Sequence, residues 1–284
     1  MIRHWVSAAV VIAAMGVGGG LAVKMRSTEV AQLSEEFQAA QPAEPNQLSD
    51  AATDTTDLRD FPHRSIVLRD EVVPGSEFDQ FRQKLRQAIQ ARDAEFVAAL
   101  LPASGVSLGF GAPLAIDELD LQNPNALLWS ILEKALTPGC DQLTDQTIEA
   151  YSSSDGESEG WVCHNLNQLF YEQYPAPETA QGVEYELSQV IVVGKDVNVR
   201  AQPSTNSDVI GILSNEVVEF DRTAWEESPD NRSPDLVSGW TPVILPNDRS
   251  GYVSNRYAYS PLGYRVLFGK VEGQWQILHI PGGD

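Results

Sequence analysis

Residues 197–218 read VNVRAQPSTNSDVIGILSNEVV and indicate short β-strands joined by tight turns. Apolar and polar residues alternate at 197–200, residues 209–213 and 217–221 are rich in β-branched or aromatic residues, and Pro203, Ser204 and Asn206 are typical turn residues. Similar runs occur on either side, at residues 190–193, 240–245 and 250–253. Several short strands at close spacing are typical of a small β-barrel, so we predict one over residues 186–260.

This stretch, with Gly239-Trp240 and Gly251-Tyr252-Val253 after it, resembles the bacterial SH3 (SH3b) domain. The family's pattern is a VNVR-x-x-P-S opening, a V-x-G-x-L strand, a G-W strand and a closing G-[WY]-V strand, and nearly all of it is present. The chain departs from the pattern at Asn215, where a turn glycine is usual, and by an insertion over residues 223–238. The resemblance implies an SH3-like β-barrel in an exported bacterial protein, and it implies no known reaction.

Small barrels of this type bind extended peptides in grooves lined by aromatic residues. The candidate ligand-binding residues are therefore Trp240, Tyr252, Asn255, Arg256, Tyr257 and Tyr259. Trp240 and Tyr252 can equally be core residues, because buried aromatic side chains dominate the core of so small a domain. The other four are better candidates for an exposed binding surface.

Residues 76–182 are expected to form a helical domain. Ser76 and Asp93 are suitable N-caps, and apolar residues follow each of them at helical spacing. Asn123, followed by Pro124, predicts the start of a further helix. With the predicted strands, this region makes an α+β protein.

Residues 261–284 alternate as in a β-hairpin, with the turn at Glu272 and Gly273. The Arg-Asp-Ala helix start at Arg92 and the Gly-x-Trp-x-Ile pattern of this hairpin weakly resemble the NTF2-like cone fold. Our hypothesis is that the hairpin completes the 76–182 domain and that the barrel is inserted between them. In such a cone, a small-molecule pocket would be lined by Phe81, Leu85 and Trp129.

The two cysteines, Cys140 and Cys163, lie 163 − 140 = 23 positions apart. In an exported protein, such a pair is most simply a disulfide. The alternative is that Cys163, next to His164, is a nucleophile, but no cysteine-hydrolase signature surrounds it. We therefore predict the disulfide.

The N-terminal region indicates export. Residues 5–23 are uncharged and almost all apolar or small, so residues 1–26 form either an uncleaved anchor in the inner membrane or a cleaved signal peptide. Both interpretations place the bulk of the protein outside the cytoplasm, in the periplasm. Residues 27–75 carry ten acidic residues against three Arg and few large apolar ones, which predicts a disordered acidic linker.

The formal charge of −21, from 40 acidic and 19 basic residues, disfavours nucleic acid and other polyanions as partners. We expect no metal or cofactor, because the four histidines are scattered. The stretch Gly105-Val-Ser107-Leu-Gly109 matches the G-x-S-x-G nucleophile elbow, which needs a strand before the serine and a helix after it. Here Pro102 and Pro113 flank the motif, so the context is wrong for catalysis.

These observations favour a non-catalytic binding or adaptor protein of the cell envelope, whose SH3b barrel binds a peptidoglycan peptide or a protein partner. Two alternatives stay open. The first is a small-molecule pocket in the NTF2-like cone. The second is a cell-wall hydrolase that depends on Ser107, Cys163 or His164.

Overall fold

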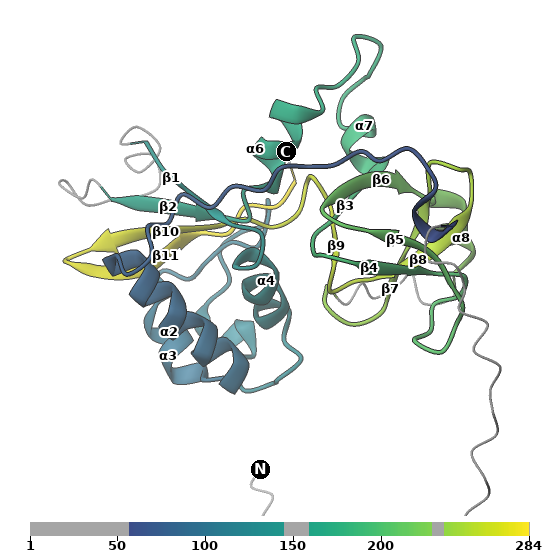
Figure 1. The fold of residues 1–284 in the computed structure, drawn as a ribbon. Coiled ribbons are helices and arrows are strands. Elements are labelled where there is room, and N and C mark those ends of the chain that lie inside the picture. Colours follow the sequence, from purple (N-terminus) through teal and green to yellow (C-terminus); the bar gives the residue numbers. More distant parts are fainter. Residues whose placement is uncertain (1–56, 145–158, 229–235, 284) are drawn as a thin grey trace, which may run out of the picture. The chain divides into compact units, whose positions relative to one another are not determined.

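The computed structural model describes residues 57–144, 159–228 and 236–283, which combine helices with two antiparallel sheets (Figure 1). They belong to one compact unit, Thr53–Asp284. The predicted signal anchor or signal peptide and residues 27–56 of the predicted linker lie outside the described residues. Within the described part of the chain, no helix has the length and apolar character needed to cross a membrane.

One sheet has four strands in the order β1-β2-β10-β11, and every neighbouring pair is antiparallel. Its strands are β1 (Cys140–Gln142), β2 (Gly160–Cys163), β10 (Val266–Val271) and β11 (Gln274–His279). Glu272 and Gly273, which join β10 to β11, both have positive φ, as a tight hairpin turn requires. Because β10 also pairs with β2, segments about a hundred residues apart in the chain share this sheet.

Helices α2 (Glu77–Ala91), α3 (Ala94–Ala99) and α4 (Leu127–Ala135) pack with this sheet. The predicted N-caps are confirmed, because the side chain of Ser76 accepts a hydrogen bond from the Asp79 N–H and that of Asp93 accepts one from Phe96. The predicted helix start at Asn123 is wrong. The Asn123 side chain accepts from the N–H two residues later and so closes a turn, and α4 begins only at Leu127.

The second sheet has seven strands in the order β5-β4-β8-β7-β6-β3-β9. They are β3 (Gln189–Val192), β4 (Val197–Arg200), β5 (Val209–Leu213), β6 (Glu216–Phe220), β7 (Trp240–Ile244), β8 (Ser250–Ser254) and β9 (Ala258–Tyr259). Among the described residues the sheet does not close into the predicted barrel, because the outer strands β5 and β9 do not pair with each other. In the described part of the chain, the two-residue β9 pairs with β3 alone, and the carbonyl of Ala258 is bound by Lys134 of α4.

Shorter helices connect these elements. They are η1 (Asp57–Arg59), η2 (Ile116–Leu119), α6 (Leu166–Gln173), α7 (Glu184–Leu187) and α8 (Arg222–Glu227). The last of them lies in the predicted insertion between β6 and β7.

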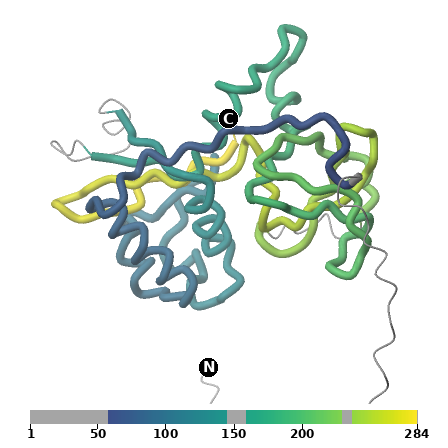
Figure 2. Tube along the Cα trace, viewed as in Figure 1, coloured from purple at the N-terminus to yellow at the C-terminus, as the bar shows by residue number. Residues whose placement is uncertain are grey.

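We call residues 57–75 the connecting segment. The sequence predicts that they belong to a disordered linker, and this prediction is wrong because they bind to both sheets. The Ile66 N–H donates to the carbonyl of Asn215 at 2.8 Å, beside β6, and the Glu71 N–H donates to that of Cys140 in β1 at 2.9 Å. Figure 2 shows the segment, in dark blue, passing both sheets. Val67 and Val73 are exposed, whereas several of its other apolar side chains are buried, including Phe61, Ile66 and Val72. The burial of these side chains therefore offsets the entropy that the segment loses when it becomes ordered, although its acidic composition is typical of a disordered linker.

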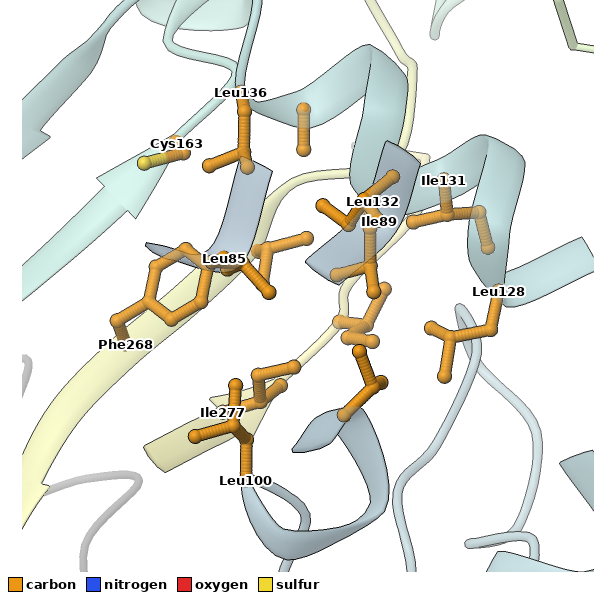
Figure 3. Close-up of a cluster of buried hydrophobic side chains, with 14 of the residues drawn as sticks. Leu85, Ile89, Leu100, Leu128, Ile131, Leu132, Leu136, Cys163, Phe268 and Ile277 are labelled. Carbon is orange, nitrogen blue, oxygen red and sulfur yellow. The ribbon is translucent and has the colours of Figure 1, made fainter. Parts of the chain in front are cut away.

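The main core lies between α2, α3, α4 and the four-stranded sheet. Phe78 of α2 is fully buried and stacks on Trp161 of β2, with ring centroids 4.8 Å apart. Figure 3 shows side chains from the helices and the hairpin pointing toward one another, including Leu85, Ile89, Leu128, Ile131, Leu132, Phe268 and Ile277. The Ile277 N–H donates to the Leu100 carbonyl at 2.8 Å, which ties β11 to the end of α3.

The predicted disulfide is confirmed. Cys140 and Cys163 are directly opposite in the β1–β2 register and are bonded through their sulfur atoms. Both residues are fully buried. The thiol of Cys163 is therefore not available as a nucleophile in this state.

Candidate functional site

The structure places the six residues predicted for ligand binding in different environments. Trp240 and Tyr252 are half-buried in β7 and β8, and Tyr257 is 41% exposed. Asn255 is half-buried and bound to β7, because its Oδ1 accepts from Thr241 Oγ1 at 2.8 Å. The exposed Arg256 forms an ion pair with Glu133 at 3.2 Å.

The prediction that Tyr259 belongs to an exposed surface is wrong. Its side chain is 3% exposed, because β9 brings the ring against Lys134 of α4 and near His164. This burial raises the pKa of the phenol to about 12, so the ring stays neutral. Tyr259 and Asn255 are the two members of the predicted set that line the cavity described next.

A cavity of about 620 Å³ is lined by residues of the seven-stranded sheet, of α4, α7 and α8 and of the loops around them, and we call it the interface cavity. Its walls are mainly apolar, which is typical of pockets that bind small molecules or inserted side chains. They include Leu108, Phe110, Ile131, Leu187, Val190, Phe220, Trp225, Leu236, Ala258, Leu262 and Tyr264. Polar lining residues include Lys134, His164, Gln189, Thr241, Asn255, Tyr259 and Ser260.

Lys134 holds α4 against the turn between β8 and β9. Its Nζ donates to the carbonyls of Asn255 at 2.6 Å and Ala258 at 2.7 Å, and it lies 3.4 Å from the centroid of the Tyr259 ring. Burial lowers the pKa of the ammonium to about 7, whereas the two carbonyls and the ring face favour the charged form. Lys134 therefore supplies a buried basic group on the cavity wall.

His164 lies directly after the disulfide-bonded Cys163 and is 2% exposed. Its φ of 70° is left-handed, a conformation in which histidine is found more often than most residues. Among the described residues, its Nδ1 has no hydrogen-bond partner. Burial, with the positive charges of Lys134 and Arg265, lowers the pKa of the imidazole to about 3, so the ring is neutral at physiological pH.

Two apolar residues of the cavity wall are also exposed to solvent. Phe110, between Gly109 and Gly111, has 82% of its surface exposed, and Leu187 at the end of α7 has 44%. Exposed apolar side chains that continue into a cavity are typical of a binding site rather than of a sealed core. They mark the part of the wall that a ligand can reach from solvent.

The pocket predicted for an NTF2-like cone is not where the cavity lies. Phe81, Leu85 and Trp129 are 9%, 0% and 1% exposed and belong to the main core. The indole N–H of Trp129 donates to the carbonyl of Leu121 at 3.2 Å. These three side chains contact the sheet and the helices instead of lining the interface cavity.

The context of a nucleophile elbow is also missing around Ser107. The residue lies between two isolated bridges, Val106 with Leu114 and Leu108 with Ile280, and the next helical residues in the chain form the short η2. No group of three or more His, Cys, Asp or Glu in the described ranges is placed to hold a metal ion.

Sequence reasoning missed Lys134 and Phe110 and weighed His164 only as a catalytic base. Phe110 carried a signal, because a large apolar residue within a glycine-rich stretch has no obvious place in a core. Lys134 carried a weaker signal, because it follows closely on Ile131 and the other apolar residues of a predicted helix. The cavity itself depends on how α4, the seven-stranded sheet and the loops at residues 108–110 and 262–264 come together, and no local pattern encodes that.

Comparisons with protein-family models, curated proteins and solved structures found no match.

Proposed function

We propose that this protein is a non-catalytic binding protein of the bacterial cell envelope and that the interface cavity is its binding site. The observation that carries the proposal is the cavity itself, about 620 Å³ in volume, mainly apolar and bordered by exposed Phe110 and Leu187. The apolar N-terminal residues 5–23, the disulfide and the resemblance to SH3b domains support a place outside the cytoplasm.

The ligand we favour is a peptide segment, from peptidoglycan or from an envelope protein, that inserts an apolar side chain. A short extended segment can lie across the exposed residues while one side chain enters the cavity. A second candidate is a free small molecule, because the cavity volume falls within the range of small-molecule sites.

A cosedimentation experiment tests the peptidoglycan ligand. The full chain, held in phospholipid nanodiscs, is mixed with purified sacculi, and released material is analysed by mass spectrometry. We expect retention without released fragments, because the proposal is non-catalytic. Released wall fragments would contradict it by showing turnover, and failure of the protein to sediment would exclude the wall as ligand.

Two leucines provide a matched control for the site. Leu187 and Leu127 are both 44% exposed, but only Leu187 is among the described residues that line the cavity. Leu187→Glu is expected to lower retention at least fivefold, since it places a carboxylate at the apolar wall. Leu127→Glu should retain wild-type binding, and equal losses in both variants would show that the cavity is not the site.

A further inference from the structure

Where the structure describes it, the lining of the interface cavity lacks the acidic residues that dominate the whole chain. The formal charge is −21, yet the lining contains no Asp or Glu among the described residues. Its basic groups are Lys134 and His164. Arg265 lies just outside the lining and donates to the carbonyl of Gly283, which does line the cavity, at 3.1 Å.

Arg265 and the charged form of Lys134 produce a positive potential at His164. The positive charges of Lys134 and Arg265 both lower the pKa of its imidazole, beyond the effect of burial. Such a potential favours an anion in the cavity, and it opposes a cation. Burial strengthens the effect because solvent screens interior charges poorly.

His164 also has an unused hydrogen-bonding atom. The side chain is buried and lines the cavity, while its Nδ1 has no partner in the described part of the chain. Buried polar atoms are nearly always hydrogen-bonded, so an unpartnered one in a residue that lines a cavity is a candidate contact for a ligand. A ligand with a polar head can supply a partner for this atom, whereas a purely apolar ligand cannot.

The remaining wall limits which anions fit. Ile131, Val190, Phe220 and Leu262 present hydrocarbon surface, which disfavours small, strongly hydrated dianions. A molecule with a long apolar part and a single negative charge can satisfy both regions. The carboxylate is the simplest such head group, because it is a monoanion with two acceptor oxygens.

We infer that the interface cavity binds an apolar molecule that ends in one carboxylate, with the carboxylate beside His164 and Lys134 and the apolar part against Ile131 and Phe220. The inference rests on the proposed function, because it names the ligand class of that same cavity. The shared chemistry is found in a free fatty acid and in the C-terminal apolar residue of a peptide.

Isothermal titration calorimetry of the full chain in nanodiscs, with empty nanodiscs subtracted, tests the inference. The first probes share one alkyl chain and differ in the head group: octanoate, octanamide and octylamine. We expect octanoate to bind at least tenfold more tightly than the amide and more tightly still than the amine. N-acetyl-leucyl-leucine and its C-terminal amide form the second pair, and the tighter of the two carboxylates identifies the source.

Two variants locate the head group and the apolar part. His164→Asn keeps a residue that tolerates left-handed backbone and should reduce the preference for octanoate over octanamide to about threefold or less, with the unfolding midpoint checked alongside. Leu187→Glu should weaken octanoate and octanamide binding, while Leu127→Glu should leave both unchanged.

The outcomes separate the inference from the proposed function. If octanamide binds as tightly as octanoate and Leu187→Glu weakens both, the cavity is a binding site and the carboxylate inference is wrong. If octylamine binds most tightly, the charge argument is wrong. If Leu187→Glu and His164→Asn both leave octanoate binding unchanged, the cavity is not the site, and both proposals fail.

Discussion

Replacing Lys134 by methionine removes the group that links α4 to the turn before β9. Methionine keeps much of the side-chain volume but donates no hydrogen bond. The carbonyls of Asn255 and Ala258 then lose their donor, and the Tyr259 ring loses its cation or amine contact. An ammonium and a neutral amine both donate to carbonyls, so the argument holds in either protonation state.

The expected cost follows from these contacts. Each half-buried carbonyl without a donor costs about 1 kcal/mol, the lower end of the usual range. The lost contact with the aromatic ring adds about 0.5 kcal/mol. Lys134→Met should therefore lower the free energy of unfolding by roughly 2–3 kcal/mol.

Lys270 offers a matched lysine-to-methionine control. Its Nζ pairs with the exposed Glu77 at 2.8 Å and with the half-buried Glu159 at 3.6 Å, and it lies 5.5 Å from the centroid of the Trp275 ring, farther than Lys134 from Tyr259. Solvent-exposed ion pairs contribute about 0–1 kcal/mol, so Lys270→Met should cost about 1 kcal/mol or less. Urea unfolding of the full chain, followed by tryptophan fluorescence, measures both. If the two variants differ by less than about 0.5 kcal/mol with unchanged m-values, the structural role given to Lys134 is wrong.

Two further predictions concern stability. Reducing the disulfide, or replacing both cysteines by Cys140→Ala with Cys163→Ala, should lower the unfolding free energy by about 3 kcal/mol, because the bond closes a loop of 23 residues in the unfolded chain. A loss below about 1 kcal/mol, measured by urea unfolding, would contradict this prediction. The second concerns His63, whose Nδ1 faces Glu216 Oε2 at 2.7 Å and whose Nε2 faces the carbonyl of Arg59 at 3.0 Å. Two acceptors favour the imidazolium, so the hydrogen bond to Glu216 raises the pKa of His63 above its ordinary 6.5. Its stabilisation, under about 1 kcal/mol because His63 is partly exposed, should be complete below pH 6.5 and lost as the pH rises through the raised pKa. His63→Gln should therefore differ most from wild type in urea unfolding at low pH, and a difference that grows with pH would reverse the argument.

Local signals in the sequence were reliable where one residue decides the conformation. Ser76 and Asp93 cap helices because their side chains accept from N–H groups three residues later, an interaction that sequence alone specifies. The side chain of Asn123 can accept in the same way, but it accepts from the N–H two residues later and closes a turn. The predicted helix start is therefore a few positions too early. The cysteine pair was predictable from compartment and number.

Features that depend on distant contacts were not predictable in the same way. The connecting segment reads as an acidic linker, yet Phe61 and Ile66 are buried against the seven-stranded sheet. Composition averages over a segment, whereas burial needs only a few apolar residues at the right places. Tyr259 was expected at an exposed surface for a related reason: its burial depends on Lys134, 125 positions earlier in the chain (259 − 134).

The pairing of β2 with β10 has a consequence for the order in which the protein can mature. All seven strands of the larger sheet are synthesised between these two partners. Until residues 266–271 emerge, the edge of β2 lacks its neighbour, and Phe78 and Trp161 lack the cover of Phe268. Uncovered strand edges and aromatic side chains promote aggregation. A nascent chain that lacks residues 266–279 therefore exposes the edge of β2 and these aromatic side chains. The four-stranded sheet can be completed only after the β10–β11 hairpin has been synthesised.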